Sequence, residues 1–451
     1  MSAFWSATAL LPGGWAQSVR FTVADGLIAS VETGVDVGPG DETHQITLPG
    51  LANVHSHAFQ RGMAGLAEHR GGNSDDNFWS WREVMYRFLD RLTPDDMQAI
   101  AALAYAEMLE TGYTHVGEFH YLHNDTDGRS YADPAEMAAR TAGAACATGI
   151  GLTMLPVFYA HSNFGGQAPG HGQRRFIHDL DSFARLLDAC GPLLAVGDRL
   201  GIAPHSLRAV TPDELAALIA MHPYGPIHIH AAEQQKEVQD SLAWSGQRPV
   251  EWLLDHAGLD QRWCLIHATH LTDAETDALA ASGAVAGLCP ITEANLGDGI
   301  FPARRFLAAG GRIATGTDSN VLIDPAQELR TLEYSQRLAH QARNVLASDA
   351  CPSVARRLFE ATLSGGAQAM GIAPGLAVGH AADFVTLTAD HPALHGRSGD
   401  QLLDSWIFAA RGSCIDTVWK RGRRVVSGGQ HQDRAAVTAQ YLKVVDRIMA
   451  Q

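Results

Sequence analysis

The chain has 451 residues, of which 46% are hydrophobic and 18% are charged. A chain of this composition can bury a large core, which excludes a disordered or fibrous protein. Its 33 basic and 49 acidic residues give a net charge of −16, which repels phosphate backbones and anionic lipid and so disfavours nucleic-acid and membrane partners.

The first 47 residues alternate short apolar runs with turns. The dipeptide Asp25-Gly26 lies between two such runs, SVRFTV and LIASVE, which is a strong signal for a β-hairpin. Residues 1–47 are therefore predicted to form a small antiparallel sheet. No basic segment followed by a long apolar stretch precedes these runs, and the six cysteines form no CxxC pair, so we expect a cytoplasmic protein with reduced thiols.

From residue 48 the pattern changes to apolar runs of strand length separated by long helical stretches. This alternation is typical of βα units and a parallel sheet, and eight such runs favour a closed (β/α)₈ TIM-like barrel over residues 48–374. The runs are GLANVHSH (50–57), THVGEF (114–119), GLTMLPVFY (151–159), RLGIAPHS (199–206), PIHIHAAE (226–233), CLIHATH (264–270), AVAGLCP (284–290) and RIATGTDS (312–319).

After a helix at 352–370 the chain returns to short β-like runs with glycine turns. Residues 375–451 contain GLAVGHAADFVTLTA and TVWKRGRRVVSGG, followed by a last helical stretch. These runs resemble the N-terminal ones more than the barrel. The prediction is therefore an α/β protein: the barrel plus a smaller β-sandwich domain, to which 1–47 supplies the first part and 375–451 supplies the rest and a final helix.

Histidine and acidic residues gather at the C-terminal ends of the predicted strands, where such barrels carry their active sites. His55 and His57 share one face of the first strand because side chains alternate with period two. The fifth strand offers His228 and His230 on one face, and the eighth ends in Asp318. Imidazoles and a carboxylate converging from three strands suit one divalent ion of borderline softness, zinc first and iron second.

The motifs PGLANVHSH, HIHAAE, LIHATHL and GTDSN resemble the amidohydrolase superfamily, and the resemblance covers essentially the whole chain. It implies metal ligation by His55, His57, His230 and Asp318, with Glu233 and His267 as catalytic groups beside the metal. The resemblance gives His228 and His270 no task, and both are interpreted as structural. Binuclear members bridge two metals with a carboxylated lysine on the fourth strand, and Lys236, Lys420 and Lys443 all lie elsewhere. The pattern therefore resembles the mononuclear deaminases.

The HxxE spacing of the fifth strand has a chemical reason. Glu233 follows His230 by three residues, outside the metal's own ligands but facing a bound substrate, where it can protonate a leaving nitrogen. The resemblance makes His267 the group that orients the attacking water and stabilises charge on the new oxygen, while Asp318 accepts the proton of that water. The alternative for Glu233 is a solvated glutamate at the start of a helix, and the alternative for His267 is a hydrogen-bonded histidine of the core.

Arginines near the other strand ends suggest a substrate with carboxylates, because a guanidinium pairs with a carboxylate through two hydrogen bonds. The alternative is that these arginines lie on the surface and pair with acids. It applies most to Arg61 and to Arg174 and Arg175. The last two lie in the glycine-rich loop 161–176, which is a candidate lid. The residues expected to contact substrate are Gln60, Arg82, Tyr121, His205 and Arg208.

A closer resemblance lies in HSHAFQRG, FWSWRE, GEFHYLHN, APHSLRAV and CPITEANLGDGIFP, which look like the N-formimino-L-glutamate deiminases. This resemblance implies hydrolysis of a small dicarboxylate amidine, release of ammonia, a role in histidine degradation and a homodimer. Two alternatives stay open. One is a mononuclear amidohydrolase that deaminates or dechlorinates an aromatic ring of the guanine or triazine type, and the other is a catalytically inactive scaffold of the same fold. Preference between the glutamate and aspartate analogues is not assigned.

Overall fold

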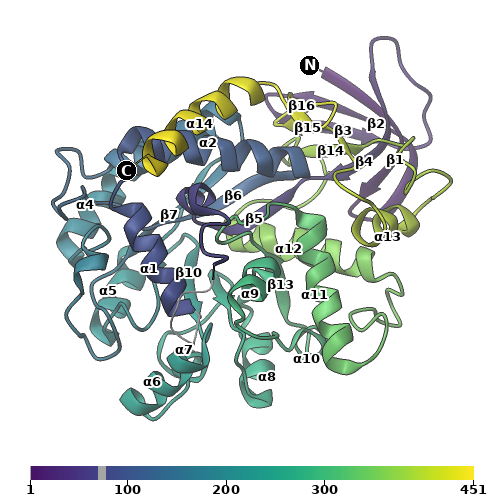
Figure 1. Cartoon of the computed structure of the whole chain (residues 1–451). Coiled ribbons are helices and arrows are strands. Elements are labelled where there is room, and N and C mark those ends of the chain that lie inside the picture. The colour runs from purple at the N-terminus through teal and green to yellow at the C-terminus, as the bar shows by residue number, and fades with distance from the viewer. Residues whose placement is uncertain (1, 70–77, 451) are drawn as a thin grey trace.

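A computed structural model describes residues 2–69 and 78–450 of the chain. Parallel strands form a barrel wrapped by helices, and a second sheet lies to one side of it (Figure 1). The predicted (β/α)₈ barrel is confirmed. Its strands are β5 (Leu51–Ser56), β6 (Tyr113–His120), β7 (Gly151–Phe158), β8 (Arg199–Leu200), β9 (Ala203–Pro204), β10 (Ile227–Ala231), β11 (Trp263–His267), β12 (Val285–Leu288) and β13 (Arg312–Thr315).

The fourth run of the sequence forms two short strands, β8 and β9, instead of one. Pro204 has no N–H to donate to a neighbouring strand. Gly201 lies at a close approach of two backbones, where an added Cβ would be 2.7 Å from the carbonyl oxygen of Pro226. The barrel nevertheless continues through single bridges, because Ile202 pairs with Ile227 on β10.

The barrel closes between the last strand and the first. The backbone N–H of Thr317 donates to the carbonyl of His55 at 3.0 Å, and the N–H of His57 donates to the carbonyl of Asp318 at 2.9 Å. A bridge between Ser56 and Asp318 completes the ring. Closure therefore brings the ends of β5 and β13, which are more than 250 residues apart in sequence, to the same place.

Several barrel helices begin with the same local chemistry. The hydroxyls of Thr93, Thr211 and Thr272 each accept the backbone N–H three residues ahead, and an acidic side chain at that position returns a bond to the threonine N–H. The helices after β5 are α1 (Phe78–Leu89), α2 (Pro94–Thr111), α3 (Glu136–Thr148), α4 (Leu180–Cys190), α5 (Pro212–Met221), α6 (Gln235–Ser245), α7 (Pro249–His256), α8 (Asp273–Ser282), α9 (Pro290–Leu296), α10 (Ala303–Ala308), α11 (Pro325–His340) and α12 (Val354–Met370), with 3₁₀ turns η1 (Ala58–Met63), η2 (His171–Gln173) and η3 (Gly191–Leu193).

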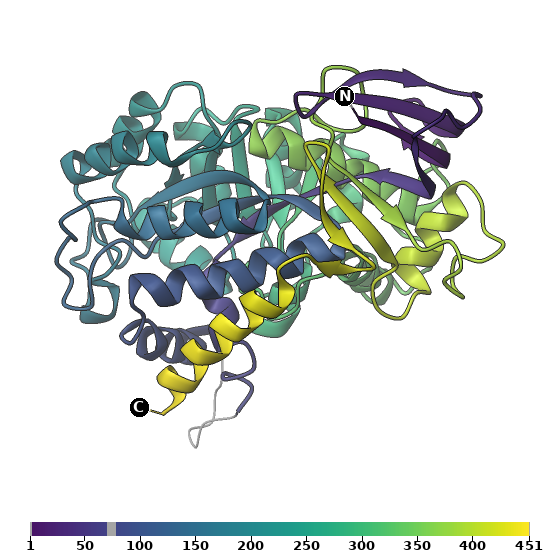
Figure 2. The same ribbon diagram turned by 90° about the horizontal axis from the view of Figure 1, so that it is seen from above.

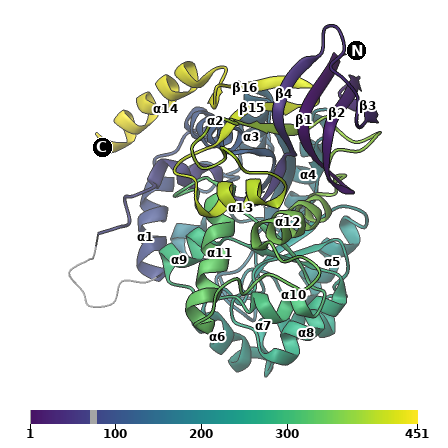
Figure 3. The same ribbon diagram turned by 90° about the vertical axis from the view of Figure 1, so that its right-hand side faces the viewer.

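The second sheet combines strands from both ends of the chain, as predicted. Its eight strands follow the order β17-β16-β15-β14-β4-β1-β2-β3, and β1 pairs with β4 in parallel, so the sheet is not purely antiparallel. Figure 3 shows β1–β4 at one side of the molecule, far from α6–α8. The strands are β1 (Ser2–Leu11), β2 (Gly14–Ala24), β3 (Leu27–Glu32), β4 (Glu42–Pro49), β14 (Phe384–Leu387), β15 (Ile415–Lys420), β16 (Arg423–Ser427) and β17 (Gln430–His431).

This sheet curves back on itself around an aromatic core. The rings of Phe4 on β1 and Trp419 on β15 lie 4.7 Å apart, although β4 and β14 separate their strands in the sheet. Neighbouring strands are about 4.8 Å apart, so a flat sheet would hold these rings at roughly three times that spacing. The curvature gives the sheet the layered packing of a sandwich.

The last helices connect the two parts. α13 (Asp400–Phe408) packs on α11 and α12, and α14 (Arg434–Met449) lies along α2 (Figure 2). Arg434 of α14 forms ion pairs with Glu107 at 3.2 Å and Glu110 at 3.0 Å on α2. The final helix thus contacts the barrel, and the boundaries at 47 and 374 stay predictions. Within the described ranges, no helix is long and apolar enough to cross a membrane.

Candidate metal and active site

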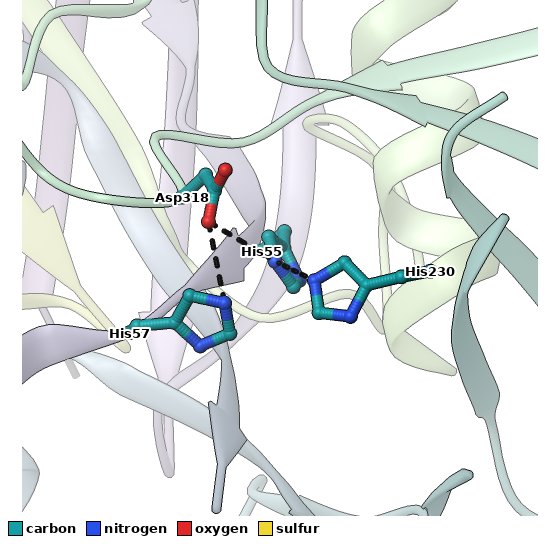
Figure 4. Close-up of side chains that lie close together, drawn as sticks. All are labelled: His55, His57, His230 and Asp318. Carbon is teal, nitrogen blue, oxygen red and sulfur yellow. Dashed lines mark hydrogen bonds and ion pairs between the residues drawn. The ribbon is translucent and has the colours of Figure 1, made fainter. Parts of the chain in front are cut away.

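Four side chains meet at the C-terminal end of the barrel strands (Figure 4). One ligand atom from each of His55, His57, His230 and Asp318 lies within 4.8 Å of the others, and all four side chains are buried. The Nε2 atoms of His55 and His57 lie 3.4 and 3.2 Å from Oδ1 of Asp318, and the Nε2 atoms of His55 and His230 are 3.0 Å apart. The structure thus brings together the whole set that the sequence predicted.

In two of the three histidines, His57 and His230, the ring nitrogen that faces away from this cluster has a backbone partner. Nδ1 of His57 lies 3.0 Å from the carbonyl oxygen of Phe119, and Nδ1 of His230 lies 3.0 Å from that of His205. A carbonyl accepts only, so each Nδ1 is protonated and donates, and each Nε2 presents a lone pair to the cluster. Burial also lowers the pKa of all three imidazoles, that of His57 to about 3, which keeps them neutral.

Asp318 is held in an uncommon backbone conformation. Its φ is +46°, and that of Asn320 is +54°, both in the left-handed region that side chains other than glycine rarely adopt. The side-chain amide of Asn320 donates to Oγ of Ser56 and to the carbonyl of His57, both at 3.1 Å. Asn320 therefore fixes the turn that carries the carboxylate against the strand that carries two of the histidines.

These donors fit a single divalent ion. Three neutral imidazole nitrogens and one carboxylate form a donor set that ions of borderline softness prefer. A second group, His267, Cys289 and Asp318, also has its ligand atoms within 4.8 Å. Burial and nearby carboxylates raise the pKa of the Cys289 thiol well above its usual value, so the thiolate that a metal requires is disfavoured there.

Glu233 and His267 lie beside the cluster, as predicted. Nε2 of His267 is 3.8 Å from Oε1 of Glu233 and 3.8 Å from Oδ2 of Asp318. Burial raises the pKa of Glu233 above its ordinary value, which favours a carboxyl that can carry a proton near neutral pH. Burial alone would lower the pKa of His267, but Glu233, Glu293 and Asp318 outweigh burial and raise it.

A cavity opens from these groups, and all the predicted substrate residues line it. Nε2 of Gln60 donates to the hydroxyl of Tyr121 at 2.8 Å. Arg208 is buried, and its Nη2 lies 3.8 Å from Oε2 of Glu233. The guanidinium of Arg82 stacks 4.3 Å from the ring centre of Trp79. The lining comprises His57, Gln60, Phe78, Trp81, Arg82, Met85, Tyr86, Tyr121, Tyr159, Phe176, His205, Arg208, His230, Glu233, His267, Leu296 and Asp318.

The sequence did not predict the apolar wall of this cavity. α1 contributes Trp81, Met85 and Tyr86, and the loop before α4 contributes Phe176. The aromatic run FWSWRE, of which only Arg82 is predicted to contact substrate, is the sequence signal for this wall. Two buried glutamates were also missed. Oε1 of Glu118 accepts the N–H of Ala58 at 2.7 Å, directly after His57, and Glu293 lies 3.2 Å from the ring of His267.

The other arginines near the strand ends and in the loop 161–176 have partners within the protein. Arg61 donates to the carbonyl of Val321 at 3.1 Å and pairs with Glu107 at 2.7 Å. Arg175 is 1% exposed, and it donates to the carbonyls of Asn124 at 2.9 Å and Leu92 at 3.0 Å. It therefore ties the segment after β7 to the end of α1 from inside the protein, whereas the more exposed Arg174 pairs with Asp90.

The two histidines left without a task also lie outside the metal cluster. Nε2 of His228 is 2.9 Å from the carbonyl oxygen of Ala369, at the end of α12. Nδ1 of His270 is 2.8 Å from the side-chain amide nitrogen of Gln235. Both contacts agree with a structural role.

Comparison with known proteins places the chain in a family. A family model described as the amidohydrolase family matches residues 46–425, and one described as the N-terminal domain of formimidoylglutamate deiminase HutF matches residues 1–45. A formimidoylglutamate deiminase from Pseudomonas aeruginosa is 51% identical, with 100% of each chain covered. The crystal structure of an amidohydrolase from Brucella melitensis is 54% identical, with a TM-score of 0.96 and 100% of each chain covered.

More distant structures share the fold. An adenosine deaminase from Xanthomonas campestris, solved with bound zinc, is 22% identical with a TM-score of 0.80, and the match covers 100% of this chain and 98% of that one. At such identity the likeness concerns the fold alone. From the match over 46–425 and the relative that is 51% identical over its full length, the chain belongs to the amidohydrolase family and, within it, to the formimidoylglutamate deiminases.

Proposed function

We propose that the protein hydrolyses N-formimino-L-glutamate to N-formyl-L-glutamate and ammonia, a step of histidine degradation. The observation that carries the proposal is the placement of two arginines, Arg82 and Arg208, in the cavity that also contains Glu233, His267 and Asp318. A linear amidine with two carboxylates fits this cavity, because the two arginines can bind the carboxylates while the other three groups transfer protons at the amidine. The relative from Pseudomonas aeruginosa with the same activity in its name supports it.

His55, His57, His230 and Asp318 would hold the metal ion, for which we propose zinc. When bound, such an ion supplies Lewis acidity: it lowers the pKa of water toward neutrality and polarises the bond under attack. The lone pairs directed inward by the backbone contacts of His57 and His230 support this ligand set. Iron is the alternative that the same donor set would accept.

The protein's own groups divide the proton transfers. Asp318 accepts a proton from the attacking water, and the N–H of His267 Nε2 stabilises charge on the new oxygen of the amidine carbon. Glu233, 3.8 Å from that ring nitrogen, then delivers a proton to the terminal imino nitrogen. The hydroxyl of the adduct then passes its proton to Glu233, and the amino group takes the proton held by Asp318. The C–N bond to that nitrogen breaks, ammonia leaves, and the nitrogen of the glutamate part stays in the formamide product.

Substrate binding falls to Gln60, Arg82, Tyr121, His205 and Arg208. The arginines take the two carboxylates, and the bond between Gln60 and Tyr121 keeps two polar groups of the wall in fixed positions. The aromatic faces of α1 and Phe176 exclude water around the carbon chain. A homodimer stays a prediction from the resemblance, and a cytoplasmic location stays one from the N-terminal sequence and the cysteine pattern. The lack of nucleic-acid or membrane partners stays a prediction from the charge of −16.

Ammonia release tests the function directly. The purified protein is assayed with N-formimino-L-glutamate, N-formimino-L-aspartate and guanine, before and after treatment with a chelator. We expect turnover of the glutamate amidine, loss of turnover on chelation and recovery on adding zinc. Faster turnover of guanine would favour the aromatic-ring alternative, and no hydrolysis of any amidine by a metal-free protein would favour the inactive scaffold.

Arg208→Met should remove most of the activity toward a dicarboxylate substrate. Truncating one partner of a buried charge pair costs about 2–5 kcal/mol, so kcat/KM for N-formimino-L-glutamate should fall by roughly 30- to 5,000-fold. Hydrolysis of formamidine, which has no carboxylate, serves as the control for the contact of Arg208 with Glu233 and should change far less. An equal loss for both substrates would contradict a carboxylate-binding role.

A further inference from the structure

Glu293 of α9 lies behind His267, on the side away from the cavity. It is 5% exposed, and its Oε1 is 3.2 Å from Nδ1 of His267. The same oxygen accepts the backbone N–H of Cys289 at 2.8 Å, which fixes the carboxylate relative to the end of β12. A carboxylate only accepts, so Nδ1 of His267 is the donor and Nε2 is the atom left for the cavity.

The ring of His267 is buried and stacks on that of His230, with the ring centres 5.6 Å apart. His267 ends β11 with a φ of +67°, and Ala268 follows with a φ of +46°, so the strand terminates in two consecutive left-handed residues. Such conformations persist where surrounding contacts over-determine them. Nε2 faces Glu233 and Asp318 across distances of 3.8 Å, longer than hydrogen bonds. Within the described residues, Glu293 therefore makes the polar contact with this ring that is short enough for a hydrogen bond.

We propose that Glu293 is a positioning residue for the hydrolysis: it fixes Nδ1 of His267 as a donor and directs the N–H of Nε2 at the new oxygen of the reacting carbon. This inference rests on the proposed role of His267 in catalysis. Glu293 itself does not line the reaction cavity, so it acts through the histidine. The arrangement resembles a catalytic side chain oriented by a third group, in which loss of the orienting carboxylate leaves the side chain present but wrongly oriented.

A competing explanation is that Glu293 only fastens the turn before α9. The chain offers a matched control for it. Glu328 of α11 is fully buried, and its Oε2 accepts the N–H of Ile291 at 2.9 Å, two residues from Cys289. Both glutamates thus hold the same turn from their side chains, but Glu293 also contacts His267.

The experiment compares Glu293→Ala, Glu293→Gln and Glu328→Ala in the metal-loaded full chain. Losing an outer partner of an active-site group typically costs about 10–100-fold, so we expect kcat of Glu293→Ala to fall by that factor with KM within a few-fold. Glu293→Gln keeps an oxygen that can accept from Nδ1, so it should recover most of this loss. Glu328→Ala should lose thermal stability but keep kcat within a few-fold.

A spectroscopic readout separates orientation from activity. In ¹⁵N-histidine-labelled protein the Nδ1 signal of His267, identified by its absence in His267→Asn, should shift in Glu293→Ala and stay in place in Glu328→Ala. An unchanged Nδ1 signal in Glu293→Ala, or equal loss of kcat in Glu293→Ala and Glu328→Ala, would overturn the positioning role alone. Full turnover in His267→Asn would overturn the proposed function of this histidine and the inference with it.

Discussion

Glu233→Gln should lose most of its turnover while keeping its metal. A positioned acid or base contributes about 10²- to 10⁴-fold, and kcat for N-formimino-L-glutamate should fall by that factor because an amide cannot pass a proton to the imino nitrogen. The carboxyl of Glu233 suits this task because burial raises its pKa. Arg208 and His267 each lie 3.8 Å from one of its oxygens. Steady-state ammonia release measures the loss.

Two measurements on the same variant show that the site is otherwise intact. Metal content by mass spectrometry should match the wild type, because Glu233 is not among the four grouped ligands. The Kd for the substrate should stay within a few-fold, since the cavity keeps both arginines. Full turnover, or loss of metal from Glu233→Gln, would contradict the role of proton donor.

The grouping of the three clustered histidines with Asp318 could be predicted because its sequence signal is local and periodic. Each ligand ends an apolar run, and parallel strands in a barrel bring all such ends to one face. His55 lies on β5 and His57 directly follows it, and both face the cluster even though the β5–β6 pairing is irregular between Asn53 and Ser56. Placement of Glu233 three residues after His230 follows from the same spacing.

Contacts between distant segments could not be predicted in this way. Glu293 reaches His267 from α9, and no spacing in the sequence connects two residues that are 26 positions apart on different elements. Arg175 has the composition of a surface residue, but three backbone carbonyls accept from it inside the protein. Whether an arginine pairs with substrate, an acid or the backbone depends on tertiary packing. Residues far away in the sequence determine that packing, so the partner cannot be predicted from the arginine and its neighbours in sequence.

The composite sheet shows a similar limit. The Asp25-Gly26 turn predicted the hairpin of β2 and β3, because both residues adopt the positive φ that the turn requires, +53° and +80°. The parallel pairing of β1 with β4 has no such signal in the sequence. It depends on the path of the chain after the β2–β3 hairpin, which brings β4 back beside β1. The contact of α14 with α2, which includes the ion pair between Arg434 and Glu110, likewise joins segments far apart in sequence.

His230→Ala should lose the metal ion itself, and His228→Ala provides the matched control. Both histidines lie on β10 and are buried, but His228 binds the carbonyl of Ala369 and His230 presents Nε2 to the cluster. Loss of a ligand should weaken metal affinity well beyond the ~10–100-fold that loss of a ligand's outer partner costs. After dialysis we expect wild type and His228→Ala to retain the ion and His230→Ala to retain little.

Thermal unfolding gives an independent measure of the same loss. An ion that binds the native state stabilises it by about 4 kcal/mol when its concentration is a thousand times Kd. Adding a chelator should therefore lower the Tm of the wild type and of His228→Ala, while the Tm of His230→Ala, already without the ion, should stay nearly constant. His228→Ala starts from a lower Tm because a buried hydrogen bond is lost, typically at a cost of about 1–3 kcal/mol. Retention of the ion by His230→Ala, or a chelator effect equal to that in wild type, would show that the four-residue cluster is not the metal site.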